Sequence, residues 1–238
     1  MAARSPQAAV VTSAHHSLSR RLAAEALGTV FLLMTVVGSG IMAESLSGGN
    51  VALALLANAV ATGTALVALI TTFGPISGAH FNPVVTLVER LSGRMSTTHA
   101  ASYAGVQVLA AIAGVVSAHL MFGETVWQLS THVRSGGGQL WSEIVATVGL
   151  VSVITSVARH TPAAVPGVVG AYITAAYWFT ASTSFANPAV TIARAFTDTF
   201  AGIRPVDVSG FVVAQLAGGV AAWACWQWLL GEDAPPHR

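Results

Sequence analysis

The chain has 238 residues, of which 54% are hydrophobic and only 8% are charged, and its mean hydropathy is +0.69. A soluble domain of this length would carry about 25% charged residues, so the composition excludes an ordinary soluble enzyme and indicates a membrane protein. The formal net charge is +1 and all ten basic residues are arginine, which leaves no polybasic surface for nucleic acid. The single cysteine excludes an intrachain disulfide and a cysteine-based metal cluster.

The first 20 residues contain no apolar run that a cleavage site could follow, so we expect a retained, disordered, cytoplasmic tail over 1–20. His15 and His16 lie in this tail, and no second ligand pair is spaced to complete a metal site with them. Beyond the tail, six apolar segments are each close to the ~20 residues that cross ~30 Å of hydrocarbon. The expected spans are 22–43, 51–73, 97–122, 140–159, 164–181 and 207–230.

Two uncharged intervals, 45–88 and 160–193, are too long for one spanning helix. The surplus contains an Asn-Pro pair in each case, within SGAHFNPVVTLVER at 77–90 and TSFANPAVTIARAF at 183–196. Asparagine is a preferred N-cap and proline is favoured at the first helical position, so each pair predicts a helix start. The apolar part that follows is only about 8–12 residues, or ~12–18 Å. Because irregular backbone at membrane depth must be buried in protein or line a polar cavity, we expect two re-entrant half-helices around a polar path.

An internal repeat supports this interpretation. The first half contains AEALGT at 24–29, FNPVVT at 81–86 and Gln107, and the second half contains SEIVAT at 142–147, ANPAVT at 186–191 and Gln215. Three spans per half is an odd number, so the second copy crosses the membrane upside down relative to the first, as in inverted-repeat transport proteins. The expected organisation is an all-α bundle with a first repeat over 21–122 and a half-helix at 82–90, an extracellular connecting loop over 123–138, a second repeat over 139–230 and a half-helix at 187–196, and a cytoplasmic tail over 231–238.

The arginines predict the orientation. With the N-terminus in the cytoplasm, seven arginines lie inside and two outside, which satisfies the positive-inside rule. The inner set is Arg4, Arg20, Arg21, Arg90, Arg94, Arg159 and Arg238, and the outer set is Arg134 and Arg204. We therefore expect a multi-pass protein of the plasma membrane with both termini in the cytoplasm.

The two half-helices predict a barrier at the membrane centre. Each helix N-terminus carries roughly half a positive charge, so two that meet there repel cations. Asn82 and Asn187 would project amide NH₂ donors into the path. If both donors hold the oxygen of one water, that water no longer relays a proton along a hydrogen-bonded chain. This arrangement is typical of rapid passage of neutral solutes with exclusion of protons.

Taken together, these residues resemble the aquaporin and aquaglyceroporin (major intrinsic protein) family over about 21–230. The resemblance rests on the two loop motifs, on AEALGT and on the two glutamines. It implies six spans, two half-helices, independent pores in a homotetramer embedded in the lipid bilayer, and no cofactor. The pore motifs are Asn82, Pro83 and Val84 in the first loop and Asn187, Pro188 and Ala189 in the second. Val84 stands where the family usually has alanine.

The resemblance also assigns supporting residues. It implies that Glu25 and Glu143 accept hydrogen bonds within the membrane and steady the re-entrant loops, and that His80 braces the first loop. The alternative for Glu25 is a carboxylate at the interface that reaches water beside Arg21. The alternative for His80 is a neutral, packed histidine.

The residues that correspond to the family's selectivity filter are small and uncharged in an ungapped count from the two motifs. They are Thr62, Ala175, Ser184 and Val190. Val190 stands where the family has an arginine, so the resemblance predicts a wide filter without a fixed cation. A gap of one or two residues would replace the second and third of these by neighbours, which are Tyr172, Ala171 and Thr183.

The resemblance does not select one standard subclass. The position that separates many glycerol channels from water channels by an aspartate is Thr191. A bacterial subgroup associated with metalloid or arsenical permeation resembles this pattern best. The expected function is a passive channel for water and small neutral solutes such as glycerol, urea or metalloid species, without catalysis. A secondary transporter and a structural membrane protein without a pore are the alternatives.

Arg194 lies four residues after Val190, on nearly the same helix face. It can restore the missing charge in a vestibule above the filter, where it would attract anionic or oxygen-rich solutes. It can instead pair with Asp198, four residues further on, and only anchor the end of the helix. The sequence leaves both interpretations open.

Overall fold

The computed structural model describes residues 16–231 and contains only helices within that range. The α-helices are α1 (Leu18–Leu46), α2 (Val51–Ser77), α3 (Pro83–Leu91), α4 (Thr97–Phe122), α5 (Gly137–His160), α6 (Val165–Phe179), α7 (Pro188–Arg194) and α8 (Pro205–Leu229), with a short 3₁₀ helix, η2 (Pro162–Ala164), before α6. Five of them, α1, α2, α4, α5 and α8, are long and apolar enough to cross a membrane. The predicted all-α bundle is confirmed.

Three predicted boundaries need correction. Helix α1 begins at Leu18, so the last residues of the predicted tail are helical, and residues 1–15 and 232–238 of the two predicted tails lie outside the described part of the chain. The fifth expected span, 164–181, is shorter than expected, because α6 has 15 residues, or ~22 Å at 1.5 Å per residue. Helix α7 ends at Arg194, two residues before the predicted end, since the amides of Ala195 and Phe196 donate to carbonyls only three residues back and close the helix with a tight turn.

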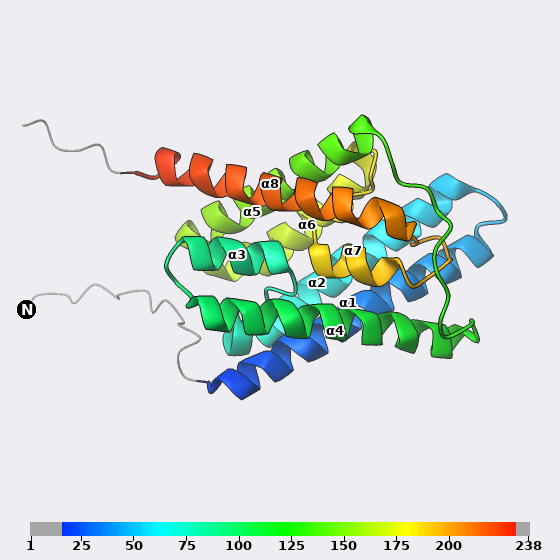
Figure 1. The fold of residues 1–238 in the computed structure, drawn as a ribbon, viewed down its shortest axis with the longest axis horizontal. Coiled ribbons are helices and arrows are strands. Elements are labelled where there is room, and N and C mark those ends of the chain that lie inside the picture. Colours follow the sequence, from blue (N-terminus) through cyan, green and yellow to red (C-terminus); the bar gives the residue numbers. More distant parts are fainter. Residues whose placement is uncertain (1–15, 232–238) are drawn as a thin grey trace, which may run out of the picture.

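The two half-helices lie end to end between α4 and α8 (Figure 1). Helix α1 packs on α2 and α4, and α5 packs on α6 and α8, while α2 and α6 join the two halves. We call the end of the bundle that carries the α1–α2 connection and the segment 123–136 the loop end, on the right in Figure 1. Helix α7 runs from the centre to the loop end, and α3 runs from the centre to the opposite end. The inverted repeat is therefore visible in the packing.

Helices α2 and α6 cross at a glycine pair. An ideal Cβ on Gly63 would lie 2.7 Å from the carbonyl oxygen of Gly170, and one on Gly170 would lie 2.5 Å from the carbonyl oxygen of Gly63. Real Cβ atoms do not approach that closely, so only glycine lets the two backbones touch here. Small residues of this kind permit close helix packing where lipid supplies no hydrophobic driving force.

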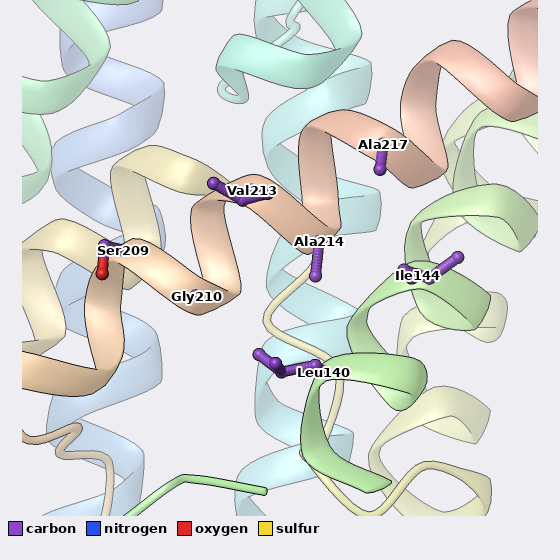
Figure 2. Close-up of a pocket in the computed structure, with 7 residues that line it drawn as sticks. All are labelled: Leu140, Ile144, Ser209, Gly210, Val213, Ala214 and Ala217. Atoms are coloured by element: carbon purple, nitrogen blue, oxygen red, sulfur yellow. The ribbon is translucent and has the colours of Figure 1, made fainter. Parts of the chain in front are cut away.

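The outward faces of the bundle are apolar. A groove between α5 and α8 opens on one of them, and Val213 at its edge is 66% exposed (Figure 2). Its lining is Leu140, Ile144, Ser209, Gly210, Val213, Ala214 and Ala217. None of these residues belongs to a half-helix, so the groove is part of the outer surface and separate from the centre where the half-helices meet.

Candidate functional site

The N-termini of α3 and α7 meet at the centre, and each half is bonded to the other there. Asn82 Nδ2 donates to the carbonyl oxygen of Ala186 (2.7 Å), and Asn187 Nδ2 donates to the carbonyl oxygen of Phe81 (2.8 Å). Both asparagines are buried, with 4% and 6% of their surface exposed. Each side chain thus bonds the residue that precedes the other asparagine, and we call this reciprocal pair the asparagine lock.

The same side chains also cap the half-helices. Asn82 Oδ1 accepts from the backbone N–H of Val84 (2.9 Å), and Asn187 Oδ1 accepts from those of Ala189 (3.0 Å) and Val190 (3.3 Å). The backbone at each asparagine is extended and proline follows, as expected of an N-cap. An amide group has two N–H donors, so the lock uses one on each asparagine. One N–H of each amide therefore remains for a solute, and the expectation that Asn82 and Asn187 both donate to one water stays a prediction.

Glu25 is fully buried and holds the first re-entrant loop, residues 78–82. Its Oε1 accepts from Ser77 Oγ (2.6 Å) and the amide of His80 (3.0 Å), and its Oε2 accepts from the amide of Phe81 (2.8 Å) and Gln107 Nε2 (2.9 Å). The carboxylate therefore lies inside the bundle and not at an interface. Four donors on two oxygens fix the backbone just before Asn82.

Glu143 repeats this arrangement in the second half. Its Oε1 accepts from Ser182 Oγ (2.5 Å) and the amide of Phe185 (2.9 Å), and its Oε2 accepts from the amide of Ala186 (2.8 Å) and Gln215 Nε2 (2.5 Å). It is also fully buried. The second re-entrant loop region covers residues 180–187. In the two re-entrant loops together, five non-glycine residues have φ between +46° and +59°, a region that such residues seldom occupy. The carboxylates supply the acceptors that hold this backbone.

Two threonines connect the glutamines to the half-helices. Gln107 Nε2 also donates to Thr86 Oγ1 (3.1 Å), and Gln215 Nε2 donates to Thr191 Oγ1 (2.8 Å). Thr191 is therefore the second-half counterpart of Thr86. By the resemblance, Thr191 is also the position at which many glycerol channels carry aspartate. His80 Nδ1 lies 3.0 Å from Thr86 Oγ1, so His80 contacts both its own loop and the half-helix that follows.

The predicted filter residues are only partly brought together. Thr62, Ser184 and Val190 are all buried, but Ala175 is exposed. On α6 the exposed positions run through 167, 171, 175 and 178, which is one outward helix face. The ungapped count to Ala175 is therefore wrong, and the alternative position 171 lies on the same outward face.

Tyr177 takes the inward position on α6. Its hydroxyl donates to Thr62 Oγ1 (3.2 Å), and its ring lies in the same buried apolar cluster as Val190. Tyr177 therefore places a large side chain beside Thr62, whereas the expected filter residues are all small. The signal in the sequence was one of two tyrosines in this span, Tyr177, which lies two residues after the predicted position. The residue count did not determine how the span is rotated about its axis.

Arg194 agrees with neither expectation. It is 2% exposed, its guanidinium carbon lies 3.4 Å from the centre of the Phe185 ring, and its Nε donates to the carbonyl oxygen of Ala201. Asp198 instead accepts from the amide (2.7 Å) and hydroxyl (2.9 Å) of Thr131. Arg194 is thus neither an open vestibule cation nor the partner of Asp198, because an aromatic face and a carbonyl bury it.

Arg134 was not expected near the site. It comes from the connecting segment, and its guanidinium carbon lies 5.0 Å from the centre of the same Phe185 ring. Burial lowers the pKa of Arg134, and the nearby Glu143 carboxylate and Tyr177 hydroxyl oppose that shift. The only signal in the sequence was that it is the one arginine of the connecting segment.

Fold and site together define a class: a membrane protein with an inverted repeat, in which two half-helices meet N-terminus to N-terminus at the centre. Comparison with known families matches residues 12–179 to the major intrinsic protein family. The chain is 56% identical to aquaglyceroporin AqpS of Rhizobium meliloti (strain 1021) over 221 residues, 93% of this chain and 94% of that protein. It is 35% identical to aquaporin NIP1-4 of Oryza sativa subsp. japonica over 211 residues, 85% of this chain and 74% of that one.

Among solved structures, the aquaglyceroporin from Plasmodium falciparum has the same fold, with a TM-score of 0.74 over 90% of this chain and 98% of that one at 21% identity. The chain belongs to the major intrinsic protein family. It is accordingly a multi-pass membrane channel protein and not an enzyme.

Proposed function

We propose that the chain forms a passive channel for water and small neutral solutes, glycerol among them, and that the path runs past the asparagine lock. The observation that carries this proposal is the lock itself, since Asn82 and Asn187 hold two helix N-termini together at the centre of the bundle. The name aquaglyceroporin, given to the relative that is 56% identical, supports glycerol as a solute.

The lock also supports exclusion of cations and protons. Two helix N-termini place partial positive charge at one point of the path, which opposes a cation. The remaining N–H of each asparagine can donate to the oxygen of a passing water. A water that accepts from both cannot accept from its neighbour in the file, so proton transfer along the file stops there.

Selectivity is proposed to lie on the loop-end side of the lock. Thr62, Tyr177, Ser184 and Val190 are buried there or in contact with one another. Val190 has no charge, so hydroxyl groups and backbone carbonyls are the polar groups that these four positions offer. Such a surface suits urea and neutral metalloid or arsenical hydroxides as well as glycerol.

The setting is proposed to be the plasma membrane, with the loop end outside. Arg20, Arg21, Arg90, Arg94 and Arg159 lie toward the opposite end, and Arg134 and Arg204 lie at the loop end, which supports this orientation. A homotetramer is proposed on the resemblance, and the exposed apolar faces of the bundle are consistent with cover by lipid and by neighbouring copies. The mass of the purified complex in detergent measures this directly.

Stopped-flow light scattering on proteoliposomes tests the function, with water, glycerol, urea and arsenite as solutes. We expect non-saturable flux down the gradient for water and glycerol. Saturable uptake coupled to an ion gradient would instead indicate a secondary transporter, and no flux above that of empty liposomes would indicate a protein without a pore.

A buried asparagine outside the path provides the matched control. Asn58 Nδ2 donates to the carbonyl oxygen of Val36 (2.9 Å) and to Ser39 Oγ (2.8 Å), between α1 and α2. Asn82→Asp removes the donor of the lock and adds negative charge at the centre, so solute and ion permeation should change together. Asn58→Asp makes the same chemical change elsewhere and should leave the ratio of glycerol flux to water flux unchanged. Equal effects of both variants on that ratio would refute the proposal that the path runs past the asparagine lock.

A further inference from the structure

Arg134 reaches from the connecting segment onto the second re-entrant loop. Its Nε donates to the carbonyl oxygen of Gly202 (2.7 Å) and its Nη1 to that of Ser182 (3.3 Å), while its guanidinium lies over Phe185. Ser182 is itself bonded to Glu143 through its hydroxyl. The guanidinium is thus attached to the loop whose last residues lead into Asn187.

The backbone around Arg134 is tied down. The amide of Arg134 donates to Asp207 Oδ2 (2.9 Å), and the carbonyl of His132 accepts from the amide of Arg204 (2.7 Å). Three residues before Arg134, Thr131 is bonded to Asp198 through both its amide and its hydroxyl. The position of the Arg134 side chain is therefore set by the fold and is not that of a solvated surface arginine.

Arg134 lies on the loop-end side of Val190, the expected filter residue that lacks a charge. Helix α7 runs from the centre to the loop end, and Arg194 is one turn beyond Val190. Both guanidinium groups contact the Phe185 ring, at 3.4 Å for Arg194 and 5.0 Å for Arg134. Arg194 is 2% exposed, whereas Arg134 is partly exposed. Of these two arginines, Arg134 is therefore the one with surface exposed at the loop end.

The guanidinium keeps unused donors. Arginine has five N–H groups, and the two bonds of Arg134 use one on Nε and one on Nη1. Within residues 16–231, Nη2 donates to no protein acceptor. We infer that Arg134 supplies, from the connecting segment, the cationic hydrogen-bond donor that α7 lacks at Val190, and that it is a specificity-determining residue at the loop-end mouth. This inference rests on the proposed channel function.

Urea and guanidinium are the probes for this inference, because they are planar and nearly equal in size but differ by one charge. Both fluxes are measured on the full chain in proteoliposomes, urea by stopped-flow light scattering and guanidinium by uptake of the radiolabelled ion. A fixed cation at the mouth adds its repulsion to that of the two helix N-termini at the lock, so it lowers guanidinium flux further and spares urea. Arg134→Gln should therefore lower the ratio of urea flux to guanidinium flux about tenfold, the factor that ~1.4 kcal/mol represents, while urea flux itself stays within about twofold of wild type.

Two further variants separate charge from a merely structural role. Arg134→Lys keeps the charge and should hold the ratio near the wild-type value. Arg204→Gln removes one positive charge from the same end, but that charge is already paired with Asp207 (3.0 Å). The variant leaves the bond from the amide of Arg134 to Asp207 and the contact of Arg134 with Phe185 in place, so its ratio should also stay near wild type. A wild-type ratio in Arg134→Gln, or an equal fall in Arg204→Gln, would overturn the inference.

A measurement on the unmodified protein covers the case in which Arg134→Gln does not fold. The screening length falls from ~30 Å at 0.01 M salt to ~10 Å at 0.1 M, so the wild-type ratio should fall as salt is raised in this range. A ratio independent of salt would contradict a cation at the mouth. If liposomes with the wild-type protein pass neither water, glycerol nor urea, the proposed function fails. If they pass these solutes but the ratio of urea flux to guanidinium flux is the same in Arg134→Gln, only the inference about Arg134 fails. If urea alone does not pass, glycerol takes its place in the ratio.

Discussion

Replacing Glu143 by glutamine tests how strongly the buried carboxylates hold the re-entrant loops. Glutamine has nearly the same shape, but one carboxylate oxygen becomes an NH₂ group that can only donate. If that group replaces Oε1 it faces Ser182 Oγ and the amide of Phe185, and if it replaces Oε2 it faces the amide of Ala186 and Gln215 Nε2. The serine hydroxyl or the glutamine amide can turn round and accept. The backbone amide cannot, so one buried N–H loses its partner in either orientation.

The expected loss follows from these bonds. A hydrogen bond to a charged group contributes about 1.5–3 kcal/mol, and a buried donor without a partner costs about 1–3 kcal/mol. We expect Glu143→Gln to destabilise the protein by about 3 kcal/mol or more. For a protein of this size that is a fall in the unfolding midpoint of roughly 6–12 °C. Because Glu25 holds the first loop with the same set of donors, Glu25→Gln should cause a loss equal to within about 1 kcal/mol, on the same estimate.

Thermal unfolding of the purified protein in detergent, followed by its intrinsic fluorescence, measures this loss, and water flux in liposomes reports the effect on the path. Glu44→Gln is the control, since Glu44 is an exposed residue near the end of α1. The reasoning fails if Glu143→Gln unfolds at the wild-type temperature with normal water flux. It fails equally if the Glu44 control loses as much stability as the two buried variants.

Three further predictions concern the filter, the helix crossing and the loop end. Val190→Arg should slow glycerol more than water because it adds a charged fork to the narrow region, whereas the uncharged Val190→Met should slow both alike. Gly63→Ala should destabilise the protein by about 1–3 kcal/mol, since its Cβ would lie 2.7 Å from the facing carbonyl of α6. Gly74→Ala should not destabilise it, because a Cβ there meets nothing within 4 Å. The unfolding midpoints of the two variants test this difference. The backbone hydrogen bond from Thr131, followed by its hydroxyl, lowers the pKa of Asp198, so this contact is fully present above about pH 4 and is lost as the pH falls through the lowered pKa. Hydrogen exchange at the Thr131 amide, corrected for its intrinsic rate, should show this loss, and Asp198→Asn should abolish the pH dependence.

The parts of the fold that depend on local chemistry could be predicted from the sequence. Each Asn-Pro pair starts a half-helix because capping and the fixed φ of proline act within a few residues. The buried roles of Glu25 and Glu143 followed from the resemblance, because an intramembrane carboxylate needs several donors and the family's re-entrant loops provide them. These features required no knowledge of how the helices are rotated.

The rotation of α6 was the part that could not be predicted. The count from Asn187 back to the filter passes through 180–187, where three residues have positive φ and no regular repeat relates residue number to direction. A helix turns about 100° per residue, so an error of two residues turns a side chain by ~200°. That is the difference between the exposed Ala175 and the inward Tyr177. The position of Arg134 was hidden for a related reason, because a segment without periodicity gives no indication of what it covers.

The asparagine lock has a consequence for how the chain is made. The donor on Asn82 and its acceptor on Ala186 are 104 residues apart, and the second bond of the lock has its acceptor in the first half and its donor in the second. When the first half leaves the ribosome and enters the membrane, its central amide and carbonyl have no partner until the second half arrives. An unpaired polar group in hydrocarbon is costly, so the half-made protein cannot rest in its final shape. The two bonds of the lock therefore form only once both halves are in the membrane.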